Sequence, residues 1–152
     1  MASAAPTLAS IIATASPAAA IADLAMLPVP DDSPDAELLT AWNDRQMALA
    51  MIEERGRFFS GERHSPGAAK MFEEADMLVY KLPAETPAGI LAKLWVALSF
   101  GGGLVATEED RAETDAIRRA DLAEVETFAD TLDCDQEIVF GVIRNLEAQV
   151  RR

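Results

Sequence analysis

Apolar residues recur at helical spacing from residue 33 onward, and the recurrence begins at residue types that favour a helix start. The first segment begins at Ser33, with Pro34 at the first helical position. A serine cap satisfies a free backbone N–H group, and proline at that position has no N–H to lose. The apolar stripe consists of Leu38, Trp42, Leu49 and Ile52. The pattern predicts a helix from Ser33 to Gly56, where glycine favours a stop.

Two further helices are predicted by the same arrangement of cap and proline. A Ser-Pro pair begins a helix over residues 65–82, and a Thr-Pro pair begins one over 86–100. The inner stripe of the first is expected to contain Met71, Phe72, Ala75, Leu78 and Val79. The inner stripe of the second is expected to contain Ile90, Leu91, Leu94, Trp95 and Leu98. Lys93 is the only charge between Gly89 and Phe100, so we expect this helix to be the most buried.

The three glycines at 101–103 end the third helix and separate it from the rest of the chain. Thr107 and Asp110 resemble a capping box and predict one long helix over 107–132. Its apolar face contains Ile117, Val125, Phe128 and Leu132. Asp133 and Gln136 form a second capping pair, which predicts a last helix over 134–152. Its stripe is expected to contain Ile138, Val139, Val142, Ile143, Leu146 and Val150.

These elements predict an all-α fold, a four- to five-helix bundle with a flexible N-terminal arm. No stretch shows sustained alternation of apolar and polar residues flanked by a hairpin turn, and alanine alone accounts for 29 residues. The bundle is expected over 33–152, as a three-helix group over 33–100 and a helical hairpin over 104–152. Short connections favour antiparallel neighbours within it.

The arm over residues 1–32 is rich in alanine and proline and is predicted to be partly disordered. Its apolar stretch resembles an export leader, but a leader needs a positive start and the first basic residue is Arg45. We therefore expect a cytoplasmic protein with no membrane span. The arm is expected to lie along the body through Ile11, Ile12, Ile21, Leu24 and Leu27.

Charge narrows the classes of function. The chain carries 26 acidic and 13 basic residues, a net charge of −13. This balance argues against direct binding of nucleic acid or of an anionic membrane, both of which need clustered cations. It favours a basic protein as partner, because an acidic face concentrates and captures cations. The carboxylates predicted to bind that partner are Glu109, Glu113, Glu124, Glu126 and Asp130.

The chain offers little chemistry for catalysis. One cysteine and one histidine exclude a disulfide framework and disfavour a zinc site. His64 is interpreted as an exposed loop residue, and Cys134 as a semi-buried structural thiol whose acidic neighbours disfavour the thiolate. Met47 and Met51 would present an adaptable surface if exposed, but we expect them to widen a buried stripe. No catalytic, cofactor-binding or metal-binding residue is predicted.

Two segments resemble small bacterial proteins. The run Pro-Asp-Ala-Glu-Leu-Leu at 34–39 and the run Leu-Pro-Ala-Glu-Thr-Pro-Ala-Gly-Ile-Leu-Ala-Lys-Leu at 82–94 are similar to small helical proteins of alphaproteobacterial genomes, often encoded in prophage-like regions. The resemblance covers residues 28–100 and implies a bacterial, cytoplasmic setting. It implies no activity and no functional residue.

The leading hypothesis is a non-enzymatic protein that acts by protein–protein interaction. A narrower form is a nucleic-acid mimic or phage-type inhibitor, whose spaced carboxylates imitate phosphates and occupy the basic groove of its target. The alternative is a small enzyme or ligand-binding bundle with a pocket between the third and last helices. A second copy of the chain is a further candidate partner.

Overall fold

The computed structural model describes residues 25–58, 66–101 and 108–151, and within these ranges all regular secondary structure is helical, with no β-strand. This confirms the predicted all-α class. The elements are α2 (Ala36–Phe58), α3 (Pro66–Lys81), α4 (Pro87–Gly101), α5 (Glu108–Arg119), α6 (Leu122–Thr127), the short 3-10 helix η1 (Ala129–Thr131) and α7 (Cys134–Val150).

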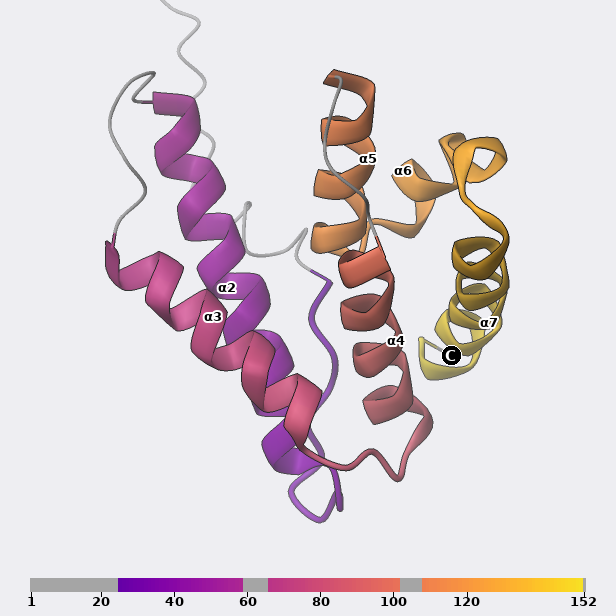
Figure 1. Ribbon diagram of the computed structural model, residues 1–152. Helices are drawn as coiled ribbons and strands as arrows, with labels where there is room; N and C mark the ends of the chain where they lie inside the picture. The colour runs from indigo at the N-terminus through magenta and orange to yellow at the C-terminus, as the bar shows by residue number, and fades with distance from the viewer. Residues whose placement is uncertain (1–24, 59–65, 102–107, 152) are drawn as a thin grey trace, which may run out of the picture.

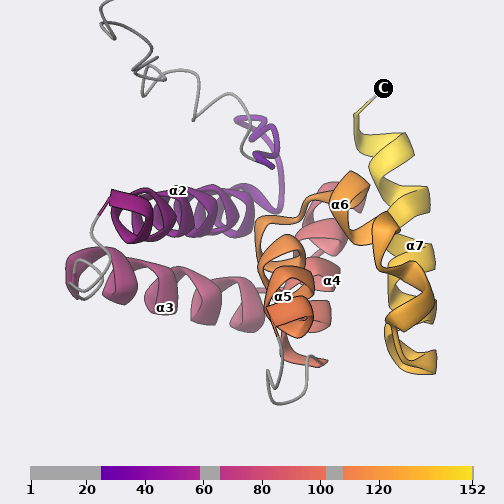
Figure 2. The same ribbon diagram turned by 90° about the horizontal axis from the view of Figure 1, so that it is seen from above.

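The helices are arranged around α4. Figure 1 shows α2 and α3 as an antiparallel hairpin on one side of α4, and α7 running antiparallel to α4 on the other. Seen from above in Figure 2, α5 lies near α4, and α6 leads from α5 across to α7. One apolar core runs through all of these helices, with Trp42 and Trp95 among its fully buried side chains. The core therefore continues across the predicted boundary at the glycine run.

The predicted caps are present where the structure describes them. Ser33 Oγ accepts from the backbone N–H of Asp35 (3.2 Å) just before α2. Thr86 Oγ1 accepts from the N–H of Gly89 (3.1 Å) at the start of α4. Asp133 and Gln136 form the predicted capping box of α7. Each cap uses a short polar side chain to satisfy an N–H group that the helix leaves free.

The last residues of the predicted arm are fixed to α2. The indole Nε1–H of Trp42 donates to the carbonyl of Ala25 (2.8 Å). The amide of Asn43 makes two hydrogen bonds with the backbone of Leu27, each 2.9 Å long. Leu27 itself is buried in the core. The other arm residues expected to contact the body, Ile11, Ile12, Ile21 and Leu24, lie outside the described residues.

A buried carboxylate joins the beginnings of α2 and α4. Asp35 is only 2 % exposed, and it accepts hydrogen bonds from the backbone N–H groups of Glu85 and Thr86 and from Thr86 Oγ1 (2.6 Å). Burial by itself raises the pKa of the Asp35 carboxyl, but the bonds from Thr86 and Glu85 outweigh it and hold the pKa below its ordinary value. The ionised form of Asp35 therefore stabilises the fold.

A glycine makes this junction sterically feasible. A methyl group at Gly89 would place its carbon 2.7 Å from Asp35 Cγ and closer still to Oδ2. Gly89 is itself buried in the first turn of α4. Only a residue without a side chain lets α4 come this close to the Asp35 carboxylate.

A second buried charge joins three helices. Arg45 of α2 is 1 % exposed; its Nε–H donates to Asp76 of α3 (2.6 Å), and its Nη1–H donates to the carbonyl of Arg118 at the end of α5 (2.9 Å). Its guanidinium lies over the rings of Trp42 and Phe72. Burial lowers the pKa of Arg45, and Asp76 opposes that shift. The arginine thus sets how the hairpin meets α5.

The predicted long helix over 107–132 is wrong, because the chain breaks at Ala120. Ala120 has a left-handed backbone, with φ of 54°, and its N–H bonds to the carbonyl of Ile117 (3.0 Å). Asp121 then caps a new helix by accepting from the N–H of Glu124 (3.0 Å). The predicted apolar face still points inward, since Ile117, Val125 and Leu132 are buried. Its residues belong to the separate short elements α5 and α6 and to the segment after η1, and not to one long helix. The first helix also differs, because α2 continues past Gly56 to Phe58.

Four residues assigned to inner stripes are exposed instead. They are Leu78, Ile90, Ile138 and Val142. Ile90 lies in the first turn of α4. For Leu78, Ile138 and Val142 the cause is that α3 and α7 each bury a single face. In α3 that face contains Ala68, Ala75 and Val79, and in α7 it contains Phe140, Ile143 and Glu147. The sequence shows a wider apolar arc than one neighbouring helix can cover.

Candidate partner-binding surface

The acidic residues predicted to bind a partner do not share one helix face, because the break at Ala120 sends them in different directions. Glu113 of α5 accepts from Thr131 Oγ1 of η1 (3.0 Å), which brings α5 and η1 together. Asp130 lies next to Thr131 in η1 and is exposed. Within the part of the chain that the structure describes, neither carboxylate forms a salt bridge.

Two other carboxylates of the set are engaged by arginines. Glu124 pairs with Arg119 (2.5 Å), and Glu126 pairs with Arg144 of α7 (3.0 Å). All four side chains are at least partly exposed, so these pairs contribute little stability but reduce the local negative charge. The side chain of Glu109 lies outside the described residues. Of the five predicted positions, Glu113 and Asp130 keep an uncompensated charge in the described structure.

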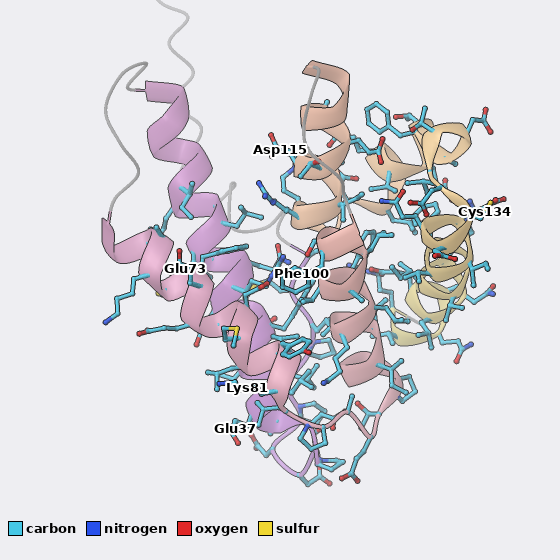
Figure 3. All side chains as sticks on the ribbon, viewed as in Figure 1. Glu37, Glu73, Lys81, Phe100, Asp115 and Cys134 are labelled. Atoms are coloured by element: carbon cyan, nitrogen blue, oxygen red, sulfur yellow. The ribbon has the colours of Figure 1, made fainter. Side chains whose placement is uncertain are left out.

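Exposed aromatic side chains form a second candidate surface, between α3 and α4. Tyr80 is 65 % exposed and Phe100 is 62 % exposed, and their rings meet edge to face with centroids 6.5 Å apart. Met77, one turn before Tyr80 on α3, is also exposed. Figure 3 labels Phe100 on the side of α4 that faces the hairpin. Below, Met77, Tyr80 and Phe100 are called the aromatic surface.

A lysine contact helps to fix the position of this surface. Lys93 of α4 donates from Nζ to the backbone carbonyl of Tyr80 (3.0 Å), at the end of α3 where free carbonyls favour a cation. Tyr80 lies in the last turn of α3 and Phe100 in the last turn of α4. Sequence reasoning missed both residues. The available signal was that Tyr80 lies outside the inner stripe of its helix and that Phe100 directly precedes three glycines.

The two methionines of α2 are exposed, so they do not widen a buried stripe as expected. Met47 and Met51 lie one turn apart on the outer side of α2, with Asp44 on the same face. The buried face of α2 contains Arg45, Leu49 and other core residues instead. The methionines therefore form a small polarizable surface patch.

The remaining candidates for chemistry lie apart from these surfaces or outside the described residues. His64 lies outside them. Cys134 is a free, exposed thiol at the first position of α7, where the chain's helix start turns it to solvent, so the expectation of a semi-buried structural thiol is wrong. Among the described residues, no three His, Cys, Asp or Glu side chains are placed to hold a metal ion together.

Side chains of α4 and α7 contact each other in the region where the alternative function would place a ligand pocket. The ring of Trp95 meets that of Phe140 at a centroid distance of 6.4 Å. Its Nε1–H donates to the buried carboxylate of Glu147 (3.2 Å), which is also bound by Arg151. Sequence reasoning missed this buried polar contact, because Glu147 looks like an ordinary surface acid.

Comparisons with protein-family models, with curated proteins and with solved structures find no match for this chain. Across the described ranges, no helix is both long enough and apolar enough to cross a membrane.

Proposed function

We propose that this protein acts by binding another protein that carries a basic surface, and that the aromatic surface is the centre of the contact. The observation that carries the proposal is the Tyr80–Phe100 pair, two large rings that remain mostly exposed although the chain has only nine aromatic residues. Aromatic side chains and methionine are enriched at the centres of protein interfaces, and a few such residues contribute most of the binding energy.

The arrangement of the aromatic surface supports this function. Tyr80 and Phe100 come from different helices, and the contact of Lys93 with the end of α3 holds those helices in register. A partner would meet two rings already in edge-to-face contact, so little side-chain entropy is lost on binding. Burying the rings removes apolar area from water, which is favourable.

Charge supports the basic character of the partner. The net charge of −13 produces a negative field around the molecule, which attracts a cationic protein and speeds its association at low salt. On α3 the exposed Glu73 lies on the same face as Met77 and Tyr80, two turns before the tyrosine. A basic side chain at the edge of the interface would meet this carboxylate.

The nucleic-acid-mimic form of the proposal depends on Glu113 and Asp130. Reversing Glu124 or Glu126 would also break an arginine pair, so a loss of binding there would be ambiguous. The Glu113→Lys/Asp130→Lys variant changes the two carboxylates of the predicted set that are described and form no salt bridge there. A mimic would lose its target in this variant, whereas a partner bound by the aromatic surface would be retained at moderate salt.

The test is an affinity experiment with the full-length chain as bait and a lysate of its own host. We expect the wild type to retain a basic protein, identified by mass spectrometry, and to release it at high salt. The Tyr80→Ala/Phe100→Ala variant should lose that protein. The Met47→Ala/Met51→Ala variant, which also removes two exposed apolar side chains, is the matched control and should retain it.

Two results would contradict the proposal. One is that the aromatic variant retains every protein that the wild type retains. The other is that the only retained proteins are acidic and are bound equally at all salt concentrations.

A further inference from the structure

The outer side of α7 is uncharged along its whole length, on a molecule with a net charge of −13. Figures 1 and 2 place α7 at the edge of the molecule, with only one helix face turned toward α4. Seven exposed residues without charge form the opposite side, and they are Cys134, Ile138, Gly141, Val142, Asn145, Ala148 and Gln149. Ile138 is 69 % exposed and Val142 is 45 % exposed. We call these seven residues the outer stripe.

The central residues of the outer stripe have the spacing of a helix-pairing seam. Cys134, Ile138, Gly141, Asn145 and Ala148 follow one another at intervals of four, three, four and three residues. This is the heptad spacing that keeps one seam facing a partner helix. A single asparagine within such a seam is a known way to specify register. The buried side of α7, with Phe140, Ile143 and Glu147, is a separate stripe already used by α4.

No neighbouring atom in the described structure requires Gly141 to lack a side chain. Gly141 lies in the middle of a 17-residue helix, where glycine lowers helix stability, and a Cβ built there meets no atom within 4 Å. Gly89, by contrast, is needed because Asp35 fills the space beside it. The space over Gly141 suits the side chain of a helix that approaches closely from outside.

The charges beside the outer stripe complement each other in an antiparallel pair. Glu137 and Arg144 lie seven residues apart on the same flank of the stripe, on either side of Gly141. In two antiparallel helices the same flank of each faces the other, so Glu137 of one would meet Arg144 of the second. Glu137 forms no salt bridge among the described residues, and Arg144, though paired with Glu126, is 54 % exposed. A parallel pair would not bring these two charges together.

We propose that α7 pairs with α7 of a second copy of this chain, antiparallel and about a two-fold axis. In this dimer Ile138 of each copy packs over the partner's Gly141, and Cys134 faces the partner's Asn145. Gly141 lets the two backbones approach closely, and Glu137 meets the partner's Arg144 on the flank. The aromatic surface belongs to α3 and α4 and is left free, so the dimer goes beyond the proposed function and does not depend on it.

The first test is sedimentation equilibrium of the full-length protein over a range of concentrations. The wild type is expected to populate a dimer, and Ile138→Glu is expected to abolish it. Ile90→Glu is the matched control, because it places the same charge on another exposed isoleucine, also near a helix N-terminus. A wild type that stays monomeric at every concentration, or a dimer that survives Ile138→Glu, overturns the proposal.

The second test determines direction and register with one added thiol. In the proposed dimer, Asn145→Cys places its thiol beside the partner's Cys134, and mild oxidation should give a covalent dimer. A bond within one chain is geometrically excluded, because the two positions are roughly 16 Å apart along one helix and a disulfide needs Cα atoms within about 7 Å. In the wild type the two copies of Cys134 are equally far apart, so oxidation should leave it unlinked.

The thiol test distinguishes the proposed antiparallel pair of α7 helices from a parallel pair. If wild-type Cys134 links efficiently to its own copy while Asn145→Cys adds nothing, the helices are parallel and the proposed register is wrong. If the Asn145→Cys chain links and Ile138→Glu prevents that link, the antiparallel pair is supported by two independent measurements.

Discussion

Asp35 looks in the sequence like an ordinary first-turn acid of a helix, placed to favour the positive end of α2. In the fold it has another role, because its carboxylate accepts hydrogen bonds from three donor groups of Glu85 and Thr86 just before and at the start of α4. Its burial is tolerated because those bonds replace the lost water. A residue 50 positions away in the chain thus completes its environment, which no local pattern indicates.

The lowered pKa of Asp35 predicts how stability changes with pH. A carboxyl whose pKa is lower in the folded than in the unfolded state stabilises the fold above its unfolded value, about 3.9, and loses that contribution as the pH falls through the folded value. Asp35→Asn should lower the free energy of unfolding by about 2–3 kcal/mol near neutral pH.

Urea unfolding of both proteins at a series of pH values measures this effect. The difference between wild type and Asp35→Asn should shrink as the pH falls below the ordinary pKa of aspartate. Asp130→Asn, at an exposed site, is the control and should show a small difference at every pH. A constant difference between wild type and Asp35→Asn down to acid pH would contradict the assignment.

Gly89 gives a second prediction at this scale. Gly89→Ala should destabilise the protein by about 1–3 kcal/mol, because the added methyl displaces the Asp35 carboxylate from its hydrogen bonds and outweighs the better helix propensity of alanine. Gly141→Ala is the matched control, since a Cβ there meets nothing within 4 Å. It should stabilise α7 by up to about 1 kcal/mol. Thermal unfolding in dilute solution compares the stabilities of the two variants. Equal changes in stability for Gly89→Ala and Gly141→Ala would show that the space beside Asp35 can accept a methyl group.

Single elements differ in how well their sequence predicts them. Helix starts with a cap and a proline were predicted correctly, because those signals act within one turn of backbone. The end of α5 was missed, because no glycine or proline marks it and the left-handed residue is Ala120. The hydrogen bond from Arg45 to the carbonyl of Arg118 lies immediately before this break. That contact comes from α2, far away in the chain.

The left-handed backbone at Ala120 predicts that a glycine there costs little stability. Ala120→Gly should leave the free energy of unfolding within about 0.5 kcal/mol of wild type, because relief of the left-handed conformation offsets the lost methyl contacts. Ala116→Gly, in the last turn of α5 with a helical backbone and fully buried, has no such relief and should cost about 1–2 kcal/mol. Chemical denaturation of both variants provides the comparison. Equal costs would mean that position 120 is not left-handed in solution.

At the scale of the whole molecule, the net charge and the apolar core have opposite effects on the stability of the fold. A single apolar core joins helices from both halves of the chain, whereas the net charge of −13 makes the surface repel itself. Exposed ion pairs such as Glu126–Arg144 offset this repulsion only locally. The excess of acid is therefore a cost to stability.

Salt should consequently stabilise this protein. Raising sodium chloride from a low concentration to about 0.3 M shortens the Debye length below 10 Å and screens the repulsion. We expect the free energy of unfolding to rise by on the order of 1 kcal/mol. The Glu113→Lys/Asp130→Lys variant has a smaller net charge and should show a weaker salt response. Denaturation in urea, which carries no charge, measures the salt response of the wild type and of the variant. A fall in stability with salt would mean that attraction within ion pairs outweighs the repulsion between acidic residues.

The sequence by itself determined the helical class, most helix starts and the acidic surface, because propensity, capping and charge depend on residue type and near neighbours. Tertiary structure decided which side of each helix is buried, where α5 ends and which acids are paired. Those outcomes depend on which helices become neighbours: α7 has α4 on one side only, so Ile138 is exposed although its spacing suits a core. Exposure of the Tyr80–Phe100 pair and burial of Asp35 have the same origin, since contacts between distant segments decide both.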